Sequence, residues 1–267
     1  MQLTMLGTGN ALVTECYNTC FVIENEGKYL LVDGGGGNTL LKQLKDAHIN
    51  WKLIKNIFVT HKHIDHLMGI IWIIRLICQN MSQNTYDGDV YLYAHQELID
   101  MIFSITHMLL QEKQTQFIGK RLHLIVLKDK DEHEIIHQKF QFFDIHSTKA
   151  KQFGFTMFHK DMRLLTCLGD EPCHSSCYEY ARNSCYLMHE AFCLYEEADI
   201  YKPYEKHHST VKDACLLAHQ LNVSHLILYH TEDKNIHNRQ QIYLNEGTSY
   251  YNGDLLIPND LDVIVLI

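Results

Sequence analysis

The sequence predicts an α/β fold in which helices cover β-sheets. Short β-type runs alternate with helical runs along the chain, and no Gly/Ser/Pro-rich linker, repeat or low-complexity tract marks a domain boundary. The composition, 46% hydrophobic and 21% charged, is that of a chain with a packed core, which excludes disordered and fibrous classes. At roughly 150 residues per domain, the length fits one large domain over residues 1–267.

The strand candidates are short runs rich in β-branched and aromatic residues. They cover Gln2–Leu6, Cys20–Glu24, Tyr29–Val32, Asn56–Thr60, Val90–Ala94, Leu122–Leu127, Phe140–His146, Phe153–Phe158, Arg163–Cys167, His225–Tyr229 and Asp262–Ile267. The helix candidates carry apolar residues at helical spacing. They cover Thr39–Ala47, His66–Cys78, Gln96–Leu110, Thr210–Gln220 and a segment near Glu171 to Ala181.

The charge and the histidine content limit the classes of function. Lys and Arg total 23 against 32 Asp and Glu, and the net charge of −9 disfavours a broad, sequence-independent grip on nucleic acid. Any nucleic-acid role must therefore be local. Histidine is the outlier, with 19 residues, and imidazole is the commonest protein ligand for transition metals.

No segment has the character of a membrane or export signal. The opening run Met1–Gly7 lacks a basic region and an apolar core, so we do not interpret it as a secretory signal. The longest apolar stretch, Ile70–Cys78, is too short to span a bilayer and is interrupted by Arg75. It suits a buried helix.

The cysteines predict a reducing compartment. Their number, nine, is odd, which argues for reduced thiols and a cytoplasmic location. Cys173 and Cys177, with His174 between them, could form a metal cluster. Free buried thiols are the preferred interpretation, because no second ligand pair follows at the usual spacing.

Two glycine-rich turns follow strand candidates. The first, Gly7–Leu12, lacks the third glycine of a dinucleotide fingerprint, and no helical pattern starts there. The second, Asp33–Asn38, lacks the Gly-Lys-Ser/Thr ending of a phosphate loop. We interpret the second as a tight turn that lets the next helix pack on its strand. A supporting contact to a phosphate or to a metal ligand is the alternative.

The segment Thr60–His66 carries the strongest functional signal in the chain. It holds His61, His63, Asp65 and His66 between an apolar strand and an apolar helix. In an extended chain the two histidines at alternate positions project to the same side, and the last two residues begin the next turn. This arrangement offers two ligands to one metal and two to a second, which leaves each ion short of a complete shell. A solvated histidine patch is the alternative.

Three more polar residues stand at the exits of apolar strands. His146 ends one β-like run, Asp170 follows a second and His230 follows a third. Taken alone, each would be interpreted as a loop or capping residue. Taken with the histidine cluster, they are the candidates for the missing ligands, because a rigid sheet can hold ligands at strand ends.

These residues resemble the pattern H-x-H-x-D-H, followed by His, Asp and His on successive strand ends, of the metallo-β-lactamase superfamily. The resemblance covers nearly the whole chain and implies an αββα sandwich with a dinuclear metal site at one sheet edge. It implies that one ion takes His61, His63 and His146 and the other Asp65, His66 and His230, with Asp170 bridging. The implied ions are usually zinc, although such ligands also accept manganese or iron.

Two further segments resemble ribonuclease Z, the endonuclease that trims the 3′ end of precursor tRNA. Met188–Phe192 is similar to its His-Glu-Ala-Thr loop, and Lys206–Ala214 to its His-Ser-Thr motif at the start of a helix. Without the resemblance, we would interpret Glu190 as an exposed helix-end carboxylate and His208 as a residue beside a Ser cap.

The resemblance suits metal-assisted cleavage of phosphodiester bonds. Two ions can hold a bridging hydroxide, since they lower the pKa of its parent water to about 7, and this hydroxide is the expected nucleophile. Asp65 could bind a metal and accept the proton of the water. His208, oriented by Glu190, could protonate the leaving oxygen. Asp65, Glu190 and His208 are therefore the expected catalytic residues.

The sequence also departs from ribonuclease Z. The short segment between His146 and Asp170 holds no long Gly/Pro-rich arm of the kind that grips tRNA. Thr231–Asp233 replaces the Ser-Arg-Tyr of that family, so acidic residues stand where a phosphate-facing arginine is expected. Four basic residues near His146 could face a phosphate, but a solvated strand surface is the preferred interpretation. They are Lys149, Lys151, Lys160 and Arg163.

Three functions remain open from the sequence. The first is a ribonuclease Z-like endonuclease or phosphodiesterase that acts on RNA 3′ regions. The second is a hydrolase of a small substrate, such as a cyclic nucleotide, a thioester or a lactone. The third, a non-catalytic metal-binding scaffold, is the weakest because the ligand set is complete. The resemblance implies a homodimer, and we expect RNA or a small phosphodiester as substrate and no membrane partner.

Overall fold

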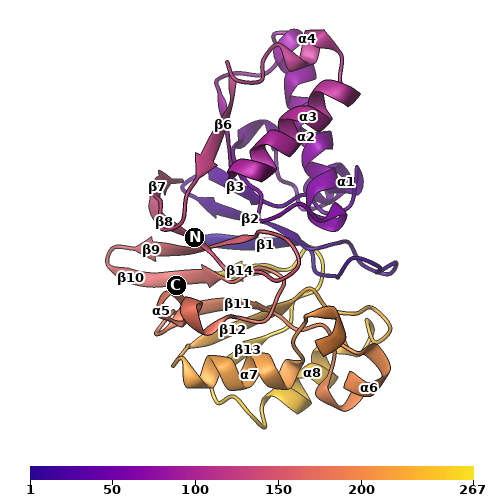
Figure 1. The fold of residues 1–267 in the computed structure, drawn as a ribbon, viewed down its shortest axis with the longest axis vertical. Coiled ribbons are helices and arrows are strands. Elements are labelled where there is room, and N and C mark those ends of the chain that lie inside the picture. Colours follow the sequence, from indigo (N-terminus) through magenta and orange to yellow (C-terminus); the bar gives the residue numbers. More distant parts are fainter.

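Two β-sheets stack face to face in the computed structural model, which describes residues 1–267, and helices cover both outer faces (Figure 1). The first sheet holds β1 (Gln2–Gly7), β2 (Cys20–Asn25), β3 (Lys28–Val32), β4 (Ile54–Phe58), β5 (Val90–His95), β6 (Leu122–Leu127) and β14 (Val263–Val265). The second holds β7 (Glu132–Ile135), β8 (Gln138–Asp144), β9 (Phe153–His159), β10 (Met162–Cys167), β11 (Tyr186–Glu190), β12 (His225–Tyr229) and β13 (Asp254–Leu256). The strand orders are β14-β1-β2-β3-β4-β5-β6 and β13-β12-β11-β10-β9-β8-β7.

The helices divide between the two outer faces (Figure 1). The first sheet carries α1 (Thr39–Asp46), α2 (Ile64–Ser82), α3 (Gln96–Leu109) and α4 (Glu112–Thr115). The second carries α5 (Tyr178–Ala181), α6 (Ala198–Tyr201), α7 (Val211–Gln220) and α8 (Arg239–Gly247). Short 3₁₀ turns cover Trp51–Leu53, Ser175–Cys177, Tyr195–Glu197 and Tyr204–Lys206. This layering confirms the expected αββα sandwich.

Three apolar layers hold the sandwich together, because successive side chains of a strand point to opposite faces. In β2, Phe21 packs into the layer between the sheets, whereas Val22 packs under the helices of the first sheet. In β12, Ile227 packs into the same central layer, whereas Leu228 packs under the helices of the second sheet. Both sheets are therefore buried on both faces, which explains their nearly continuous apolar strands.

The directions of the strands determine which edge of each sheet carries the candidate site residues. β3 and β4 are parallel neighbours in the first sheet, and β10, β11 and β12 are parallel neighbours in the second. The carboxyl ends of parallel strands meet at one edge of a sheet, where ligands commonly bind. Asp33, Thr60, Asp170, Glu190 and His230 all lie at or just beyond such strand ends.

The turn after β3 brings α2 unusually close to the sheet. A Cβ on Gly34 would lie 2.4 Å from the backbone nitrogen of Ile70, and a Cβ on Gly69 would lie 1.8 Å from the carbonyl oxygen of Gly34. The backbone nitrogen of Gly34 also donates to the carbonyl of His66 at 2.8 Å. Asp33–Asn38 therefore forms a packing turn, but the helix that it brings close is α2 and not the next helix, α1, that was expected from the sequence.

Two expected elements differ in the structure. The helix expected near Glu171 to Ala181 is wrong, since only the 3₁₀ turn and the four-residue α5 form there. Pro172 disfavours the helical conformation for the residue before it, so a regular helix cannot start at Glu171. Met188–Glu190, expected in a loop, forms the end of β11, where every residue is buried.

The cysteines are all free thiols, and Cys177 is buried. Cys173 and Cys177 form no disulfide, and the preference for free thiols over a metal cluster there stays a prediction. Burial raises the pKa of the Cys167 thiol to about 11, so that thiol stays protonated near neutral pH. No helix combines the length and the apolarity that crossing a bilayer requires.

Candidate metal centre

The histidine segment forms one wall of the candidate site. After β4 the chain stays extended through His63, and α2 then begins at Ile64. The Nε2 atom of His61 lies 2.8 Å from Nδ1 of His63, so the extended run brings these two rings together. Asp65 and His66 lie in the first turn of α2, and both are buried. The local geometry expected from the sequence is therefore present.

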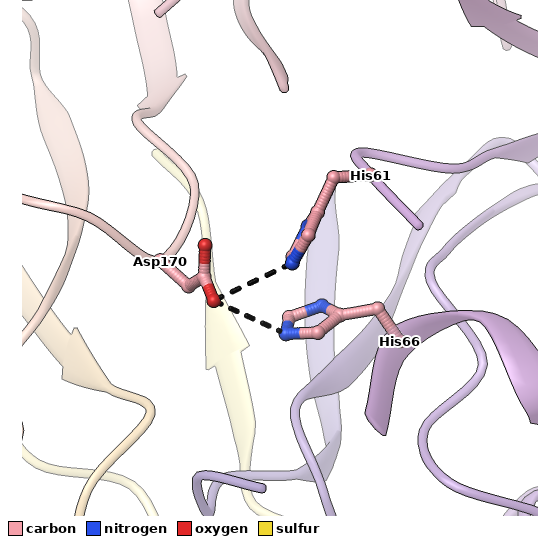
Figure 2. A group of neighbouring side chains, drawn as sticks. All are labelled: His61, His66 and Asp170. Carbon is pink, nitrogen blue, oxygen red and sulfur yellow. Dashed lines mark ion pairs between the residues drawn. The ribbon is translucent and has the colours of Figure 1, made fainter. Parts of the chain in front are cut away.

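Asp170 meets this segment from the opposite sheet. Its Oδ2 atom lies 3.5 Å from Nε2 of His61 and 3.7 Å from Nε2 of His66 (Figure 2). Asp170 follows β10 in the second sheet, whereas the two histidines follow β4 in the first. The carboxylate therefore bridges the two halves of the sandwich at the site.

His230 completes a second group of donors. Its Nε2 atom lies 3.5 Å from Oδ2 of Asp65 and 3.6 Å from Oδ2 of Asp170. The Nε2 atom of His66 lies 3.4 Å from the same oxygen of Asp65. His61, His66 and Asp170 form one set of converging donor atoms, and Asp65, His66 and His230 form another.

The donor atoms fit divalent cations better than they fit one another. Nε2 of His66, Oδ1 of Asp170 and Nε2 of His230 are buried without a hydrogen-bond partner, and an unpaired buried polar atom is costly. Two ligands of one tetrahedral zinc ion stand about 3.4 Å apart, close to the separations of 3.4–3.7 Å found here. The site therefore suits bound metal.

Residues outside the cluster fix the orientation of two imidazoles. Nδ1 of His66 donates to Oδ2 of Asp33 at 2.8 Å, and the hydroxyl of Thr60 donates to the same oxygen at 2.7 Å. Thr60 also contacts Nδ1 of His61 at 2.9 Å. These contacts occupy the Nδ1 atoms and direct both Nε2 atoms into the cluster, where that of His66 has no hydrogen-bond partner and that of His61 contacts His63. Asp33 thus contacts a candidate metal ligand, which was the alternative interpretation of its turn.

The electrostatics of the cluster favour a bound positive charge. Burial would raise the pKa of Asp65 and of Asp170, but neighbouring histidines lower both below the ordinary carboxyl value. Burial lowers the pKa of His61, against the opposing charge of Asp170. Burial would also lower the pKa of His66, yet Asp65 and Asp33 raise it above its ordinary value. A proton on His66 therefore compensates the carboxylates when no cation does.

The structure does not bring His146 into the cluster. β8 ends at Asp144, and His146 lies in the turn beyond, exposed and with a left-handed φ of 58°. Its backbone nitrogen donates to the side chain of Asp144 at 2.8 Å, and its ring faces His174 at 5.8 Å between centroids. A role of His146 as a ligand stays a prediction.

Glu190 and His208 meet beside the cluster. Glu190 ends β11, is fully buried and accepts a hydrogen bond from the backbone of Ser209. Its Oε2 lies 3.4 Å from Nδ1 of His208. The ring of His208 stacks on Phe192 at 4.8 Å and lies 5.2 Å from the ring of His230. The interpretation of Glu190 as an exposed carboxylate is therefore wrong, because β11 is a central strand.

The acidic residues after β12 hold neighbouring loops in place through hydrogen bonds. Glu232 and Asp233 are both buried. Oδ2 of Asp233 accepts from the backbone nitrogen of Glu15 at 2.9 Å, and Oε2 of Glu232 accepts from the backbone nitrogen of Asn235 at 3.1 Å. Their charges are thus partly neutralised by backbone amides, so this segment shapes the cavity wall.

A cavity of about 500 Å³ opens over the cluster. Its polar floor includes His63, Asp65, Asp170, His208 and His230. Its walls combine apolar and aromatic side chains with three lysines. These wall residues include Leu12, Ile64, Phe192, Tyr201 and Lys149. This volume lies within the range of small-molecule sites.

Comparison with known proteins agrees with this geometry. The family model described as Anti-Pycsar protein Apyc1 matches residues 1–246. A ribonuclease Z of Nanoarchaeum equitans (strain Kin4-M) is 24% identical, over 98% of this chain and 92% of the relative. The structure of human tRNase Z, short form, superposes with a TM-score of 0.75 at 20% identity and covers 100% of both chains. The metallo-β-lactamase fold protein YhfI from Bacillus subtilis superposes with a TM-score of 0.79 at 14% identity, over 98% of both.

The family model spans most of the chain, and the two structural neighbours superpose over nearly its whole length. The resemblance read from the histidine segment is therefore confirmed. This chain belongs to the family of the anti-Pycsar protein Apyc1 and has the metallo-β-lactamase fold of ribonuclease Z-like proteins.

Proposed function

We propose that this chain is a metal-dependent hydrolase that cleaves phosphodiester bonds, as a ribonuclease Z-like endonuclease or a related phosphodiesterase. The observation that carries the proposal is the Glu190–His208 pair, whose imidazole lies 5.2 Å from that of the candidate ligand His230. Phosphodiester cleavage releases an alkoxide that needs a proton, and an imidazole oriented by a carboxylate can donate one.

The donor set supports two divalent cations. His61, His63 and Asp170 would hold one, and Asp65, His66 and His230 the other, with Asp170 shared between them. Zinc is the first choice for imidazole and carboxylate donors, and manganese or iron are alternatives. Bound cations would polarise the phosphoryl group and acidify a water molecule.

The side chains of this protein supply orientation and proton transfer. Asp65, a carboxylate because its neighbours lower its pKa, would accept a hydrogen bond from the attacking water and orient it. His208 directs Nδ1 to Glu190 and lines the cavity. Its other ring nitrogen, Nε2, would donate a proton to the leaving oxygen of the substrate.

A small phosphodiester, such as a cyclic nucleotide, is a second candidate substrate. The cavity of about 500 Å³ has the size of a small-ligand site. β9 and β10 are joined by a two-residue turn, and the loop between β8 and β9 spans only residues 145–152, so no arm extends from this region to hold a long RNA. The aromatic ring of Phe192 at the cavity wall could stack on a nucleobase.

A panel of substrates tests the proposal. Zinc-loaded protein would be assayed on precursor tRNA, a cyclic nucleotide, a simple aryl phosphodiester, a thioester and a β-lactam. We expect cleavage of at least one phosphodiester, lost on chelation and restored by added metal. Preference for the cyclic nucleotide over tRNA would select the second candidate. Cleavage of only the thioester or the β-lactam would contradict the proposal.

Two variants test the proton donor. Glu190→Gln and His208→Ala should each lower phosphodiester turnover by about 10²–10⁴-fold, with the metal content unchanged. Glu205→Gln, at an exposed carboxylate near His208 in the sequence, is the matched control and should keep the wild-type rate. Wild-type rates in both test variants would remove the assigned role.

The family resemblance also leads us to propose a homodimer, and the odd number of cysteines leads us to propose a cytoplasmic location. Sedimentation of the zinc-loaded protein at micromolar concentration tests the first of these. A monomer under those conditions would contradict it.

A further inference from the structure

The ammonium group of Lys149 contacts His208, the proposed proton donor of the candidate site. Lys149 follows β8 in the loop at residues 145–152, and its side chain lines the cavity. Its Nζ atom lies 3.4 Å from Nε2 of His208. The residue as a whole is exposed, but its side chain is 23% exposed and lines the cavity.

A buried carboxylate fixes the loop that carries Lys149. Glu171 is 5% exposed, and its two oxygens accept from the hydroxyl of Ser147 at 2.7 Å and from the backbone nitrogen of Thr148 at 3.1 Å. Oε1 of Glu171 also lies 3.9 Å from Nζ of Lys149. Two adjacent residues therefore have different roles. Asp170 belongs to the cluster of candidate metal ligands, whereas Glu171 positions Lys149.

The other basic side chains of this region are placed differently. Lys206 lines the cavity and is exposed, as Lys149 is, but its Nζ lies 4.9 Å from the ring of Phe192 and not beside His208. Lys234 also lines it and is exposed. Lys151 faces Asp144 at 4.0 Å, and Lys160 is exposed in the turn between β9 and β10. Lys149 alone contacts a residue assigned to the chemistry.

The negative charge of the cavity indicates a role for Lys149. Four carboxylates line it, namely those of Asp65, Asp170, Glu232 and Asp233, in a chain of net charge −9. A positive group on the protein therefore favours the binding of an anionic substrate, in addition to any bound cations. When His208 faces the leaving oxygen, a phosphoryl oxygen of the substrate would lie close to the ammonium group of Lys149.

We propose that Lys149 binds a non-bridging oxygen of the substrate phosphoryl group, so that the cavity selects anionic phosphate esters over neutral esters. The proposal rests on the function proposed above. The weak 3.4 Å contact between Lys149 and His208 would give way to a charge-assisted hydrogen bond to the phosphate. Lys149 thus takes, in this proposal, the phosphate-facing role that the sequence left as the alternative, whereas Lys160 is exposed and keeps the interpretation as a solvated surface residue.

Inorganic phosphate is the probe that tests Lys149 without relying on turnover. Phosphate would be titrated calorimetrically into zinc-loaded wild type, Lys149→Gln, Lys149→Arg and the control Lys160→Gln. We expect Lys149→Gln to weaken phosphate binding by about 10- to 100-fold, Lys149→Arg to restore most of it, and Lys160→Gln to match wild type. Zinc content and thermal unfolding of each variant show that the fold and the metals are kept.

The outcomes separate this inference from the proposed function. Wild-type phosphate affinity in zinc-loaded Lys149→Gln would overturn the role of Lys149, even if the protein cleaves phosphodiesters. Weaker phosphate binding in Lys149→Gln would support the role, even if wild type cleaves none of the phosphodiesters in the panel, a result that would contradict only the proposed function. Where wild type is active, kcat/KM for the aryl phosphodiester should fall in Lys149→Gln and recover in Lys149→Arg.

Discussion

Asp33 and His66 are joined by a hydrogen bond of 2.8 Å between Oδ2 and Nδ1, although they lie 33 positions apart in the sequence. The glycine turn after β3 makes the contact possible because it lets α2 approach the strand end. The bond fixes the tautomer of His66 and directs Nε2 toward Asp65 and Asp170. A carboxylate in this position also raises the basicity of a metal-binding imidazole.

Asp33→Asn should therefore weaken metal binding without removing a ligand. The amide keeps the shape of the side chain but loses its charge, so we expect a loss of about 10-fold or more in zinc affinity. Competition with a chromophoric chelator measures it. Asp161→Asn, an exposed carboxylate in the turn between β9 and β10, is the control. Equal affinity in both variants would show that Asp33 does not tune the metal site.

The pH dependence of metal binding follows from His66. Burial would lower its pKa, but Asp65 and Asp33 raise it above its ordinary value. In the metal-free protein this raised pKa contributes stability that is fully present below about pH 6.5. That contribution is lost as the pH rises through the folded-state pKa. Metal binding requires the neutral ring, so cations bind more tightly over the same rise in pH.

The difference in Tm between zinc-loaded and metal-free protein should accordingly grow from about pH 6 to about pH 8. Asp65 and Asp170 do not alter this expectation, because their pKa values are lowered and their contribution is lost only in acid. Thermal unfolding of both forms across this range measures the effect. A difference that shrinks with rising pH would contradict the role given to His66.

The family resemblance and the geometry of the structure disagree about the role of His146. The resemblance implies a ligand, whereas the structure places this residue in an exposed turn with its ring against His174. From the geometry, His146→Ala should keep the zinc stoichiometry of the wild type, while His61→Ala should lose zinc. Metal analysis of the two purified variants decides the matter. Loss of one zinc equivalent in His146→Ala would establish the ligand that the resemblance implies.

Local patterns made much of the site predictable. His61, His63, Asp65 and His66 lie within one short segment, so the strand-to-helix boundary alone fixes their relative placement. Asp170 and His230 were predictable because each follows an apolar strand, and strand ends meet at one sheet edge. The segment rule is local, whereas the strand-end rule also selected His146, which lies in an exposed turn outside the cluster.

Long-range contacts explain what the sequence could not show. Glu190 belongs to a central strand, and only its neighbours β10 and β12 make it buried. Lys149 gains its position from Glu171 and His208, which lie 22 and 59 residues away. Arg239 is fully buried and donates to Thr231 at 2.7 Å and to the carbonyl of Pro258 at 2.8 Å. No spacing rule links such partners.

The approach of α2 to the end of β3 predicts one large effect on stability. A methyl group on Gly69 would lie 1.8 Å from the carbonyl oxygen of Gly34, and that atom is backbone and cannot rotate away. Gly69→Ala must therefore shift α2, and we expect a loss of about 1–3 kcal/mol or more in the free energy of unfolding. Because the shift also moves Asp65 and His66, zinc affinity should fall in parallel. Gly37→Ala is the matched control, since a Cβ there meets nothing within 4 Å. Chemical denaturation of both metal-free variants measures the difference, and equal midpoints would show that the helix does not depend on this contact.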